Sequence, residues 1–185
     1  MGSESASEQL PFHLQGNFAP VREETTAVEL EVQGAIPPEL RGLYLRNGPN
    51  PQSGGSPHWF FGDGMVHGVA LADGKANWYR NRWVRTRPYL EGGEKAILIQ
   101  PDGSVDRTVA KANTNIVGHA GRLLALVESS FPTEMNWELD TVGTYDFCGK
   151  LTTAMTAHPK LCPVTGEMHF FGYGFAPPYL TYYCA

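Results

Sequence analysis

Short apolar stretches that alternate with polar residues are the main feature of the chain from Gly42 onward. Alternation with a period of two is typical of a strand with one buried face, and turn-forming residues interrupt it at short intervals. The pattern predicts strands over residues 65–72, 76–84, 115–118, 122–128, 139–147, 152–157, 168–173 and 179–183. Tight turns are expected at Asp73-Gly74, His119-Ala120-Gly121 and residues 163–166. The expected fold class is therefore all-β.

The first forty residues show little strand pattern. Residues 1–9 are small, polar and acidic and lack the basic start and apolar stretch of a signal peptide. We interpret residues 1–16 as a flexible leader, followed by an extended segment over residues 17–21 and a single helical turn over residues 37–40. The folded domain is thus expected over residues 17–185, with a turn over residues 46–51.

Short strands at this spacing are typical of a sandwich, a barrel or the blades of a propeller. At about 40–45 residues per four-stranded blade, the chain supplies at most about four blades. The last predicted strand, over residues 179–183, runs almost to the C-terminus and leaves an unpaired edge. This pattern is expected of a domain that is cut rather than complete.

Composition narrows the class of partner. Charged residues make up 18% of the chain and the net charge is −5, so there is no basic field for nucleic acid or for anionic lipid. No apolar run approaches the length of a membrane span. The three cysteines are odd in number and form no CxxC pair, which argues against a disulfide framework or a zinc knuckle and favours the reducing cytoplasm.

His158 is the first candidate for chemistry, because the common catalytic signatures are absent. It follows the strand predicted over residues 152–157 and precedes Pro159, which favours an extended backbone at His158. A histidine at the end of a strand is well held for binding a metal ion. The ordinary alternative is a core histidine that is hydrogen-bonded to a carbonyl group.

Glu128 and Asp63 are the carboxylates that stand out. Glu128 follows five apolar residues, and it either reaches solvent or accepts a hydrogen bond from the ring of a metal-bound histidine. Asp63 is expected to make a turn and to cap backbone N–H groups. Arg46 is a candidate partner for a buried acid. The four tryptophans, Trp59, Trp78, Trp83 and Trp137, are expected to pack in the core.

Several motifs in one order carry a resemblance to a known family. They are Leu43 to Pro51, His58-Trp59-Phe60, Gly62 to His67, Asn113-Thr114-Asn115, His119 to Leu126, Thr156 to Lys160, Gly166-Glu167 and Phe171-Gly172-Tyr173. Over roughly residues 17–185, the chain resembles the carotenoid cleavage oxygenases. The acid that often precedes the Gly-Asp-Gly motif in this family is replaced by Phe61.

The resemblance implies the N-terminal blades of a seven-bladed β-propeller, with Fe(II) on the propeller axis held by four histidines. His158 matches the first iron ligand of the family. Glu128 matches a glutamate that hydrogen-bonds a ligand histidine further along the chain, and the other three ligands are expected beyond Ala185. Such an enzyme adds O₂ across one C=C bond of an apolar polyene, a carotenoid or an apocarotenoid, and yields two carbonyl products without an organic cofactor.

Two alternatives to this activity remain open at the sequence level. The first is the cleavage of a stilbene. Stilbene-cleaving relatives carry a lysine directly before the glutamate, and here that position is Val127, which donates no hydrogen bond. The second is that a chain of this length is a truncated, catalytically inactive relative that binds partners. A water-insoluble substrate also makes peripheral contact with a membrane an expectation.

Overall fold

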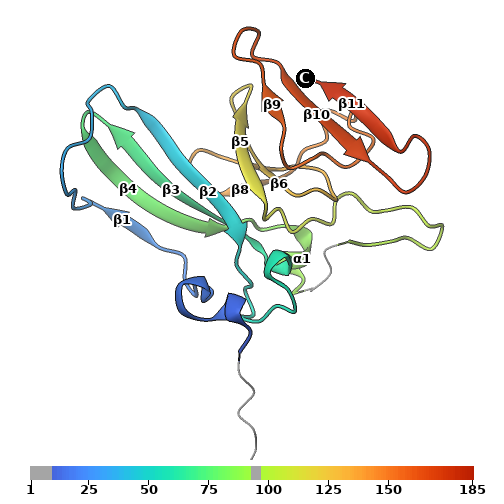
Figure 1. The fold of residues 1–185 in the computed structure, drawn as a ribbon, viewed down its shortest axis with the longest axis horizontal. Helices are drawn as coiled ribbons and strands as arrows, with labels where there is room; N and C mark the ends of the chain where they lie inside the picture. Colours follow the sequence, from blue (N-terminus) through green and yellow to red (C-terminus); the bar gives the residue numbers. More distant parts are fainter. Residues whose placement is uncertain (1–9, 93–96) are drawn as a thin grey trace, which may run out of the picture.

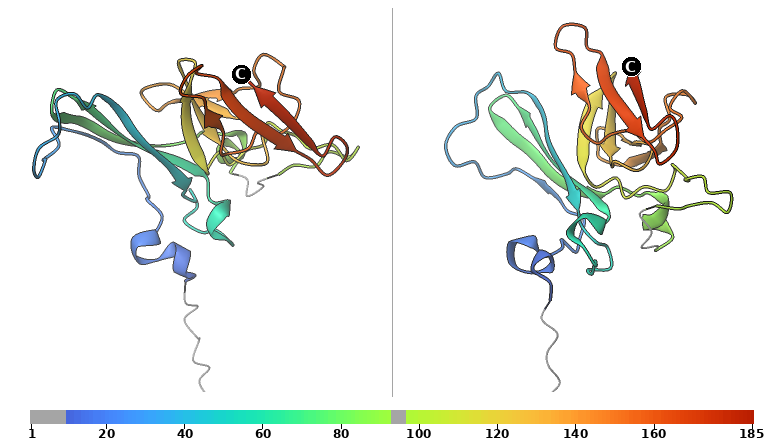
Figure 2. Two further views of the ribbon diagram at one scale, coloured as in Figure 1. Left: turned by 45° about the horizontal axis from the view of Figure 1, so that its top comes forward. Right: turned by 45° about the vertical axis from the view of Figure 1, so that its right-hand side comes forward.

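The computed structural model describes residues 10–92 and 97–185. Three antiparallel sheets follow one another along the chain and lie side by side (Figure 1). The two rotated views in Figure 2 show the same succession, with the third sheet at the C-terminal end. The all-β prediction is confirmed, and the arrangement is that of a partial propeller.

The first sheet has the order β1-β4-β3-β2. Its strands are β1 (Thr26–Val28), β2 (Gly42–Pro49), β3 (Gly64–Ala72) and β4 (Lys75–Trp83). The turn between β3 and β4 is the predicted Asp73-Gly74 pair, and both residues have a positive φ, 52° and 74°. Two positive φ values in succession define the turn that matches the twist of a hairpin.

The second and third sheets follow the same plan. The second has the order β5-β6-β7-β8, from β5 (Asn115–His119), β6 (Arg122–Leu126), β7 (Thr133–Met135) and β8 (Thr141–Thr144). The third has the order β11-β10-β9, from β9 (Lys160–Leu161), β10 (Met168–Tyr173) and β11 (Leu180–Cys184). The one α-helix of the described residues is the single turn α1 (Arg87–Leu90). Short 3₁₀ turns are η1 (Phe12–Leu14), η2 (Gly16–Phe18) and η3 (Trp59–Phe61).

Two core clusters lie between the sheets. Val66, Val84, Leu123, Met135 and Leu139 are buried together between the first and second sheets. The second cluster joins the second and third sheets, and its buried members are Leu124, Leu126, Leu151, Met155, Ala157, Met168 and Phe170. The alternation along β6 explains this, because successive side chains point to opposite faces and so supply both clusters.

Asparagine side chains link the inner edges of the three sheets. Asn47 of β2 donates to the carbonyl groups of Ala112 and Asn115, at 2.8 and 2.9 Å. Asn115 of β5 donates in turn to the carbonyl of Ala157, at 2.8 Å. Each link gives a backbone carbonyl a side-chain donor, and together they fix the position of the segment that leads into His158.

Several sequence-based expectations are wrong in detail. Residues 46–49 continue β2, paired with residues 64–67 of β3, and the hydrogen-bonded turn follows later, closed by the Gly54 N–H to the Pro51 carbonyl. The strand predicted over residues 139–147 is shortened to β8 because Leu139 and Phe147 have positive φ values of 69° and 55°. Trp83 is buried and Trp78 packs against the core, whereas Trp59 and Trp137 are exposed.

The N-terminal segment also differs from expectation. Residues 1–9 lie outside the described residues. Within the rest of the expected leader, Phe12–Leu14 form a 3₁₀ turn and His13 is buried, with its ring hydrogen-bonded to the carbonyl of Ser56 at 3.0 Å. The segment expected to be extended begins with the second 3₁₀ turn, Gly16–Phe18. Contacts with distant residues therefore order a stretch that the local pattern could not assign. The predicted turn over residues 37–40 is present, closed by the Leu40 N–H to the Pro37 carbonyl.

Candidate metal and substrate site

A cavity of about 550 Å³ opens at the inner edge of the sheets. The end of β2, the turn η3 and the segment after β6 form its walls. Its apolar lining comes from Pro49, Phe60, Phe61, Ile97 and Val127, and its polar lining includes Glu128 and His158. A mostly apolar cavity with a few convergent polar groups is the usual form of a small-molecule site.

His158 stands at the end of a buried segment without regular structure. The Met155 N–H donates to the Ser130 carbonyl at 3.1 Å, and the Thr156 N–H donates to the Phe171 carbonyl at 2.8 Å. Residues 152–157 therefore form no strand, and the predicted strand there is wrong: their backbone groups bond to separate partners rather than to one ladder. The alternating pattern reflects burial in the core between the sheets, and the imidazole, 65% exposed, is presented to the cavity.

Glu128 lies beside His158 at the wall of the cavity. Its Oε1 atom is 3.7 Å from the Nε2 atom of His158, longer than a hydrogen bond. The Thr156 hydroxyl donates to the same carboxylate at 3.4 Å. Burial, and to a lesser degree the Glu128 charge, raise the pKa of the nearby Tyr173. The structure thus brings the two predicted site residues together, facing one space, without Glu128 holding the His158 ring.

Gly172 of β10 allows the His158 segment to pack closely on the third sheet. A Cβ atom at Gly172 would lie 1.9 Å from the Thr153 hydroxyl and 2.1 Å from the Ala154 carbonyl. The Gly172→Ala substitution is therefore expected to displace residues 153–154 and to lower the free energy of unfolding by about 1–3 kcal/mol. Chemical denaturation measures this change. The matched control is Gly118→Ala, where a Cβ atom meets nothing nearer than 3.8 Å; equal effects of the two substitutions would contradict the prediction.

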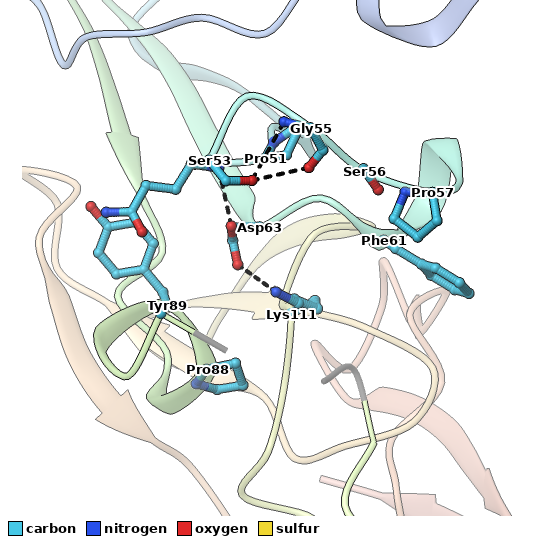
Figure 3. A pocket seen from close by; sticks show the side chains of 12 residues that line it. Pro51, Ser53, Gly55, Ser56, Pro57, Phe61, Asp63, Pro88, Tyr89 and Lys111 are labelled. Carbon is cyan, nitrogen blue, oxygen red and sulfur yellow. Dashed lines mark hydrogen bonds and ion pairs between the residues drawn. The ribbon is translucent and has the colours of Figure 1, made fainter. Parts of the chain in front are cut away.

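Asp63 lines a separate hollow beside the cavity (Figure 3). One carboxylate oxygen accepts the Gln52 N–H at 3.1 Å, which confirms the predicted backbone cap. The other oxygen accepts from the Lys111 ammonium group at 2.7 Å, and both side chains are nearly buried. Lys111 lines the apolar cavity and also a neighbouring hollow of about 330 Å³. The sequence analysis missed Lys111, because only the fold brings it next to Asp63. Arg46, the predicted partner of a buried acid, lines the cavity without an ion pair among the described residues.

The other described histidines lie away from this cavity. His58 caps η3 by accepting the Phe60 N–H at 3.2 Å, and His67 is hydrogen-bonded to the Tyr79 hydroxyl at 2.9 Å. Burial, followed by the Arg46 charge, lowers the pKa of His67. His158 is the one histidine among the described residues that lines the cavity.

Comparison with known proteins assigns the family. A sequence model of the retinal pigment epithelial membrane protein family matches residues 18–185. The chain therefore belongs to this family, that of the carotenoid cleavage oxygenases.

Relatives agree with this assignment. The carotenoid cleavage oxygenase of Mycobacterium tuberculosis is 50% identical over 178 residues, covering 94% of this chain and 35% of that protein. The carotenoid 9,10(9',10')-cleavage dioxygenase 1 of Arabidopsis thaliana is 42% identical, covering 94% and 38%. The resveratrol cleavage oxygenase 1 of Aspergillus fumigatus is 40% identical, covering 91% and 36%. The chain thus spans just over a third of the length of these relatives.

Solved structures share the fold. The lignostilbene dioxygenase of Pseudomonas brassicacearum superimposes with a TM-score of 0.79 at 34% identity, covering 96% of this chain and 41% of that chain. A cobalt-substituted Synechocystis apocarotenoid oxygenase (ACO) gives a TM-score of 0.68 at 29% identity, covering 85% of this chain and 38% of that chain. The match lies within less than half of each of these larger structures, as expected for a set of N-terminal blades.

Proposed function

We propose that this chain is part of a non-haem Fe(II) dioxygenase that cleaves a C=C bond of a carotenoid or apocarotenoid into two carbonyl products. The observation that carries the proposal is the pairing of His158 and Glu128 at the wall of an apolar cavity. The names of the relatives from Mycobacterium tuberculosis and Arabidopsis thaliana support this class of substrate.

The side chains at the cavity fit a bound iron ion. The neutral imidazole of His158 is a common ligand of Fe(II), and its ring is open to the cavity rather than held by a protein acceptor. One imidazole does not hold the ion alone, and the proposal therefore includes three further ligand histidines beyond Ala185. Bound iron would supply activation of O₂, while the apolar wall binds the polyene, excludes water and selects the double bond by position. Glu128 would accept the ring N–H of another ligand histidine and fix its orientation.

The direct test is an assay of the iron-loaded protein with an apocarotenal under ¹⁸O₂. Addition of one O₂ molecule across the double bond places one labelled oxygen in each of two carbonyl products, which mass spectrometry detects. Absence of both products from protein that contains iron would contradict the proposal and favour a catalytically inactive relative that binds partners.

Stilbene cleavage is the second candidate, supported by the similarity to the lignostilbene and resveratrol enzymes. Val127 argues against it because it adds an apolar side chain, without a hydrogen-bond donor, to the cavity wall. The Val127→Lys substitution is expected to lower apocarotenal turnover at least about 10-fold, since a charge would enter an apolar wall. The expected gain is in the binding of a phenolic stilbene. Steady-state assays on both substrates measure the change, with Val127→Leu as the control that keeps the wall apolar.

We also propose that an exposed aromatic surface takes substrate from membranes. Phe12, Phe18 and Trp59 pack edge to edge, and Phe60 is 70% exposed beside the cavity that it helps to line. None of the described helices is long and apolar enough to cross a membrane. Contact through this surface would be peripheral. The three cysteines are free, which supports a reducing, cytoplasmic location.

Substitution of this surface is expected to weaken binding to neutral phosphatidylcholine vesicles. Phe12→Ser together with Phe60→Ser removes two exposed rings, each worth about 1.5–3 kcal/mol when buried in an apolar medium. A loss of at least about 10-fold in the vesicle partition coefficient is therefore expected in co-sedimentation. Phe175→Ser is the matched control, because Phe175 is 92% exposed and lies between β10 and β11. An equal loss in the control would contradict the assignment of this surface.

A further inference from the structure

The outer face of the third sheet carries a set of metal-ligating side chains away from the cavity. Glu167 and His169 are two residues apart, so they point to the same side of the sheet. Cys184 of β11 is paired directly with His169 of β10 and shares that side. Met168 and Phe170, between and after them, point the other way into the core. The register of β10 and β11 alone therefore brings a carboxylate, an imidazole and a thiol together.

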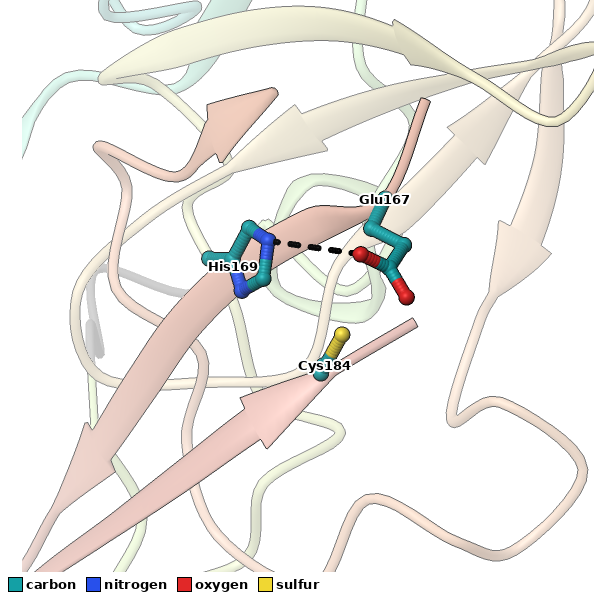
Figure 4. A group of neighbouring side chains, drawn as sticks. All are labelled: Glu167, His169 and Cys184. Atoms are coloured by element: carbon teal, nitrogen blue, oxygen red, sulfur yellow. Dashed lines mark ion pairs between the residues drawn. The ribbon is translucent and has the colours of Figure 1, made fainter. Parts of the chain in front are cut away.

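The distances among these three groups suit a small cation (Figure 4). The ligand atoms of Glu167, His169 and Cys184 all lie within 4.8 Å of one another. The Nε2 atom of His169 is 3.9 Å from Oε2 of Glu167. Bond lengths of about 2.0–2.3 Å to zinc place the ligands of a tetrahedral site about 3.2–3.8 Å apart. Side-chain rotation alone can close a difference of this size, because Glu167 and Cys184 are exposed.

The His169 ring is already oriented for binding. Its Nδ1 atom is hydrogen-bonded to the Tyr182 hydroxyl at 2.6 Å. When Nδ1 donates this bond, the lone pair of Nε2 is directed toward Glu167. A second hydrogen bond of this kind fixes the tautomer and orientation of a metal-bound histidine in known sites.

We propose that Glu167, His169 and Cys184 bind a divalent transition-metal ion of the zinc class, with a fourth position open to solvent. One thiolate, one imidazole and one carboxylate form a donor set that suits Zn²⁺ better than Mg²⁺ or Ca²⁺. This site is separate from the His158 cavity and does not depend on the proposed function. Bound metal would join the two long strands of the hairpin and stabilise the edge of the third sheet.

Cobalt distinguishes this site from the cavity site. A Co²⁺ ion bound by a thiolate gives a sulfur-to-metal charge-transfer band in the near ultraviolet, and no cysteine lines the His158 cavity. We expect this band when Co²⁺ is titrated into the full chain under a non-chelating reductant, and its loss when Zn²⁺ is added. Cys184→Ser and His169→Gln are expected to abolish the band, and Glu167→Gln, at an exposed position, to weaken binding without a change in fold.

Control variants distinguish the three proposed ligands from other cysteine and histidine side chains. Cys148→Ser removes another exposed cysteine, and His158→Gln removes the cavity histidine; both are expected to leave the band intact. Tyr182→Phe is expected to lower Co²⁺ affinity about 10–100-fold by removing the partner of Nδ1. Absence of a band in the unmodified chain, or a band that survives Cys184→Ser, would overturn the proposal.

Discussion

Replacing His158 by glutamine is expected to remove bound iron and to lower the rate of polyene cleavage at least about 10³-fold, equivalent to about 4 kcal/mol of transition-state stabilisation. The reason is geometric as well as chemical. The ring is carried by a segment that bonds to the second sheet, through Asn115, and to the third, through Phe171. A glutamine amide in that place is a poor ligand for Fe(II). Iron content by mass spectrometry and turnover of an apocarotenal measure the two effects.

His119→Gln is the matched control for this substitution. His119 ends β5 at the hairpin to β6, and it does not line the cavity. Its replacement is expected to leave iron content and turnover unchanged. If His158→Gln kept both its iron and its turnover, His158 would be a structural histidine after all.

Glu128 is expected to contribute less than His158. Its carboxylate is 3.7 Å from the His158 ring and accepts from Thr156, so it is free to accept another ring N–H from within the cavity. Substitution of a residue that orients a metal ligand typically lowers metal affinity or activity about 10–100-fold. Under the proposed function the two side chains would have different roles, with His158 binding the ion and Glu128 orienting another ligand.

Local sequence pattern predicted the hairpins well and the site segment poorly. The Asp73-Gly74 and Ala120-Gly121 turns need positive φ, and the strands on either side pair with their nearest neighbours in sequence. The residues of each hairpin are therefore enough to predict it. Residues 152–157 alternate in the same way, yet they form no strand, because their hydrogen-bond partners lie in other parts of the chain.

Groups assembled from distant parts of the chain could not be found from spacing. The local sequence marks His158 and Glu128 as candidates and the family resemblance gives them roles, but only the fold shows that they face one cavity. The three cysteines gave no metal pattern in sequence, since Cys184 meets His169 only through the register of β10 and β11. A search for histidines and cysteines on facing positions of a predicted hairpin would have found that pair.

The buried ion pair of Asp63 and Lys111 is expected to give the largest single effect on stability. Their side chains are 12% and 5% exposed, and their charged atoms are 2.7 Å apart. Asp63→Ala deprives the Lys111 ammonium group of this carboxylate inside the protein. Loss of one partner from a buried pair typically costs about 3–5 kcal/mol, because the remaining charge is left poorly solvated. Chemical denaturation is expected to show a loss of this size in the free energy of unfolding.

A double substitution separates the pair from the packing around it. Asp63→Asn keeps an oxygen that accepts the Gln52 N–H, and Lys111→Met keeps most of the length of the side chain without its charge. The two together are expected to cost less than Asp63→Ala alone, because neither charge of this pair is kept without the other. Strictly additive losses in the double-mutant cycle would contradict a direct interaction. Lys111 and Phe61 line both the hollow and the cavity. Under the proposed function, the ion pair would therefore also hold the wall against which a polyene lies.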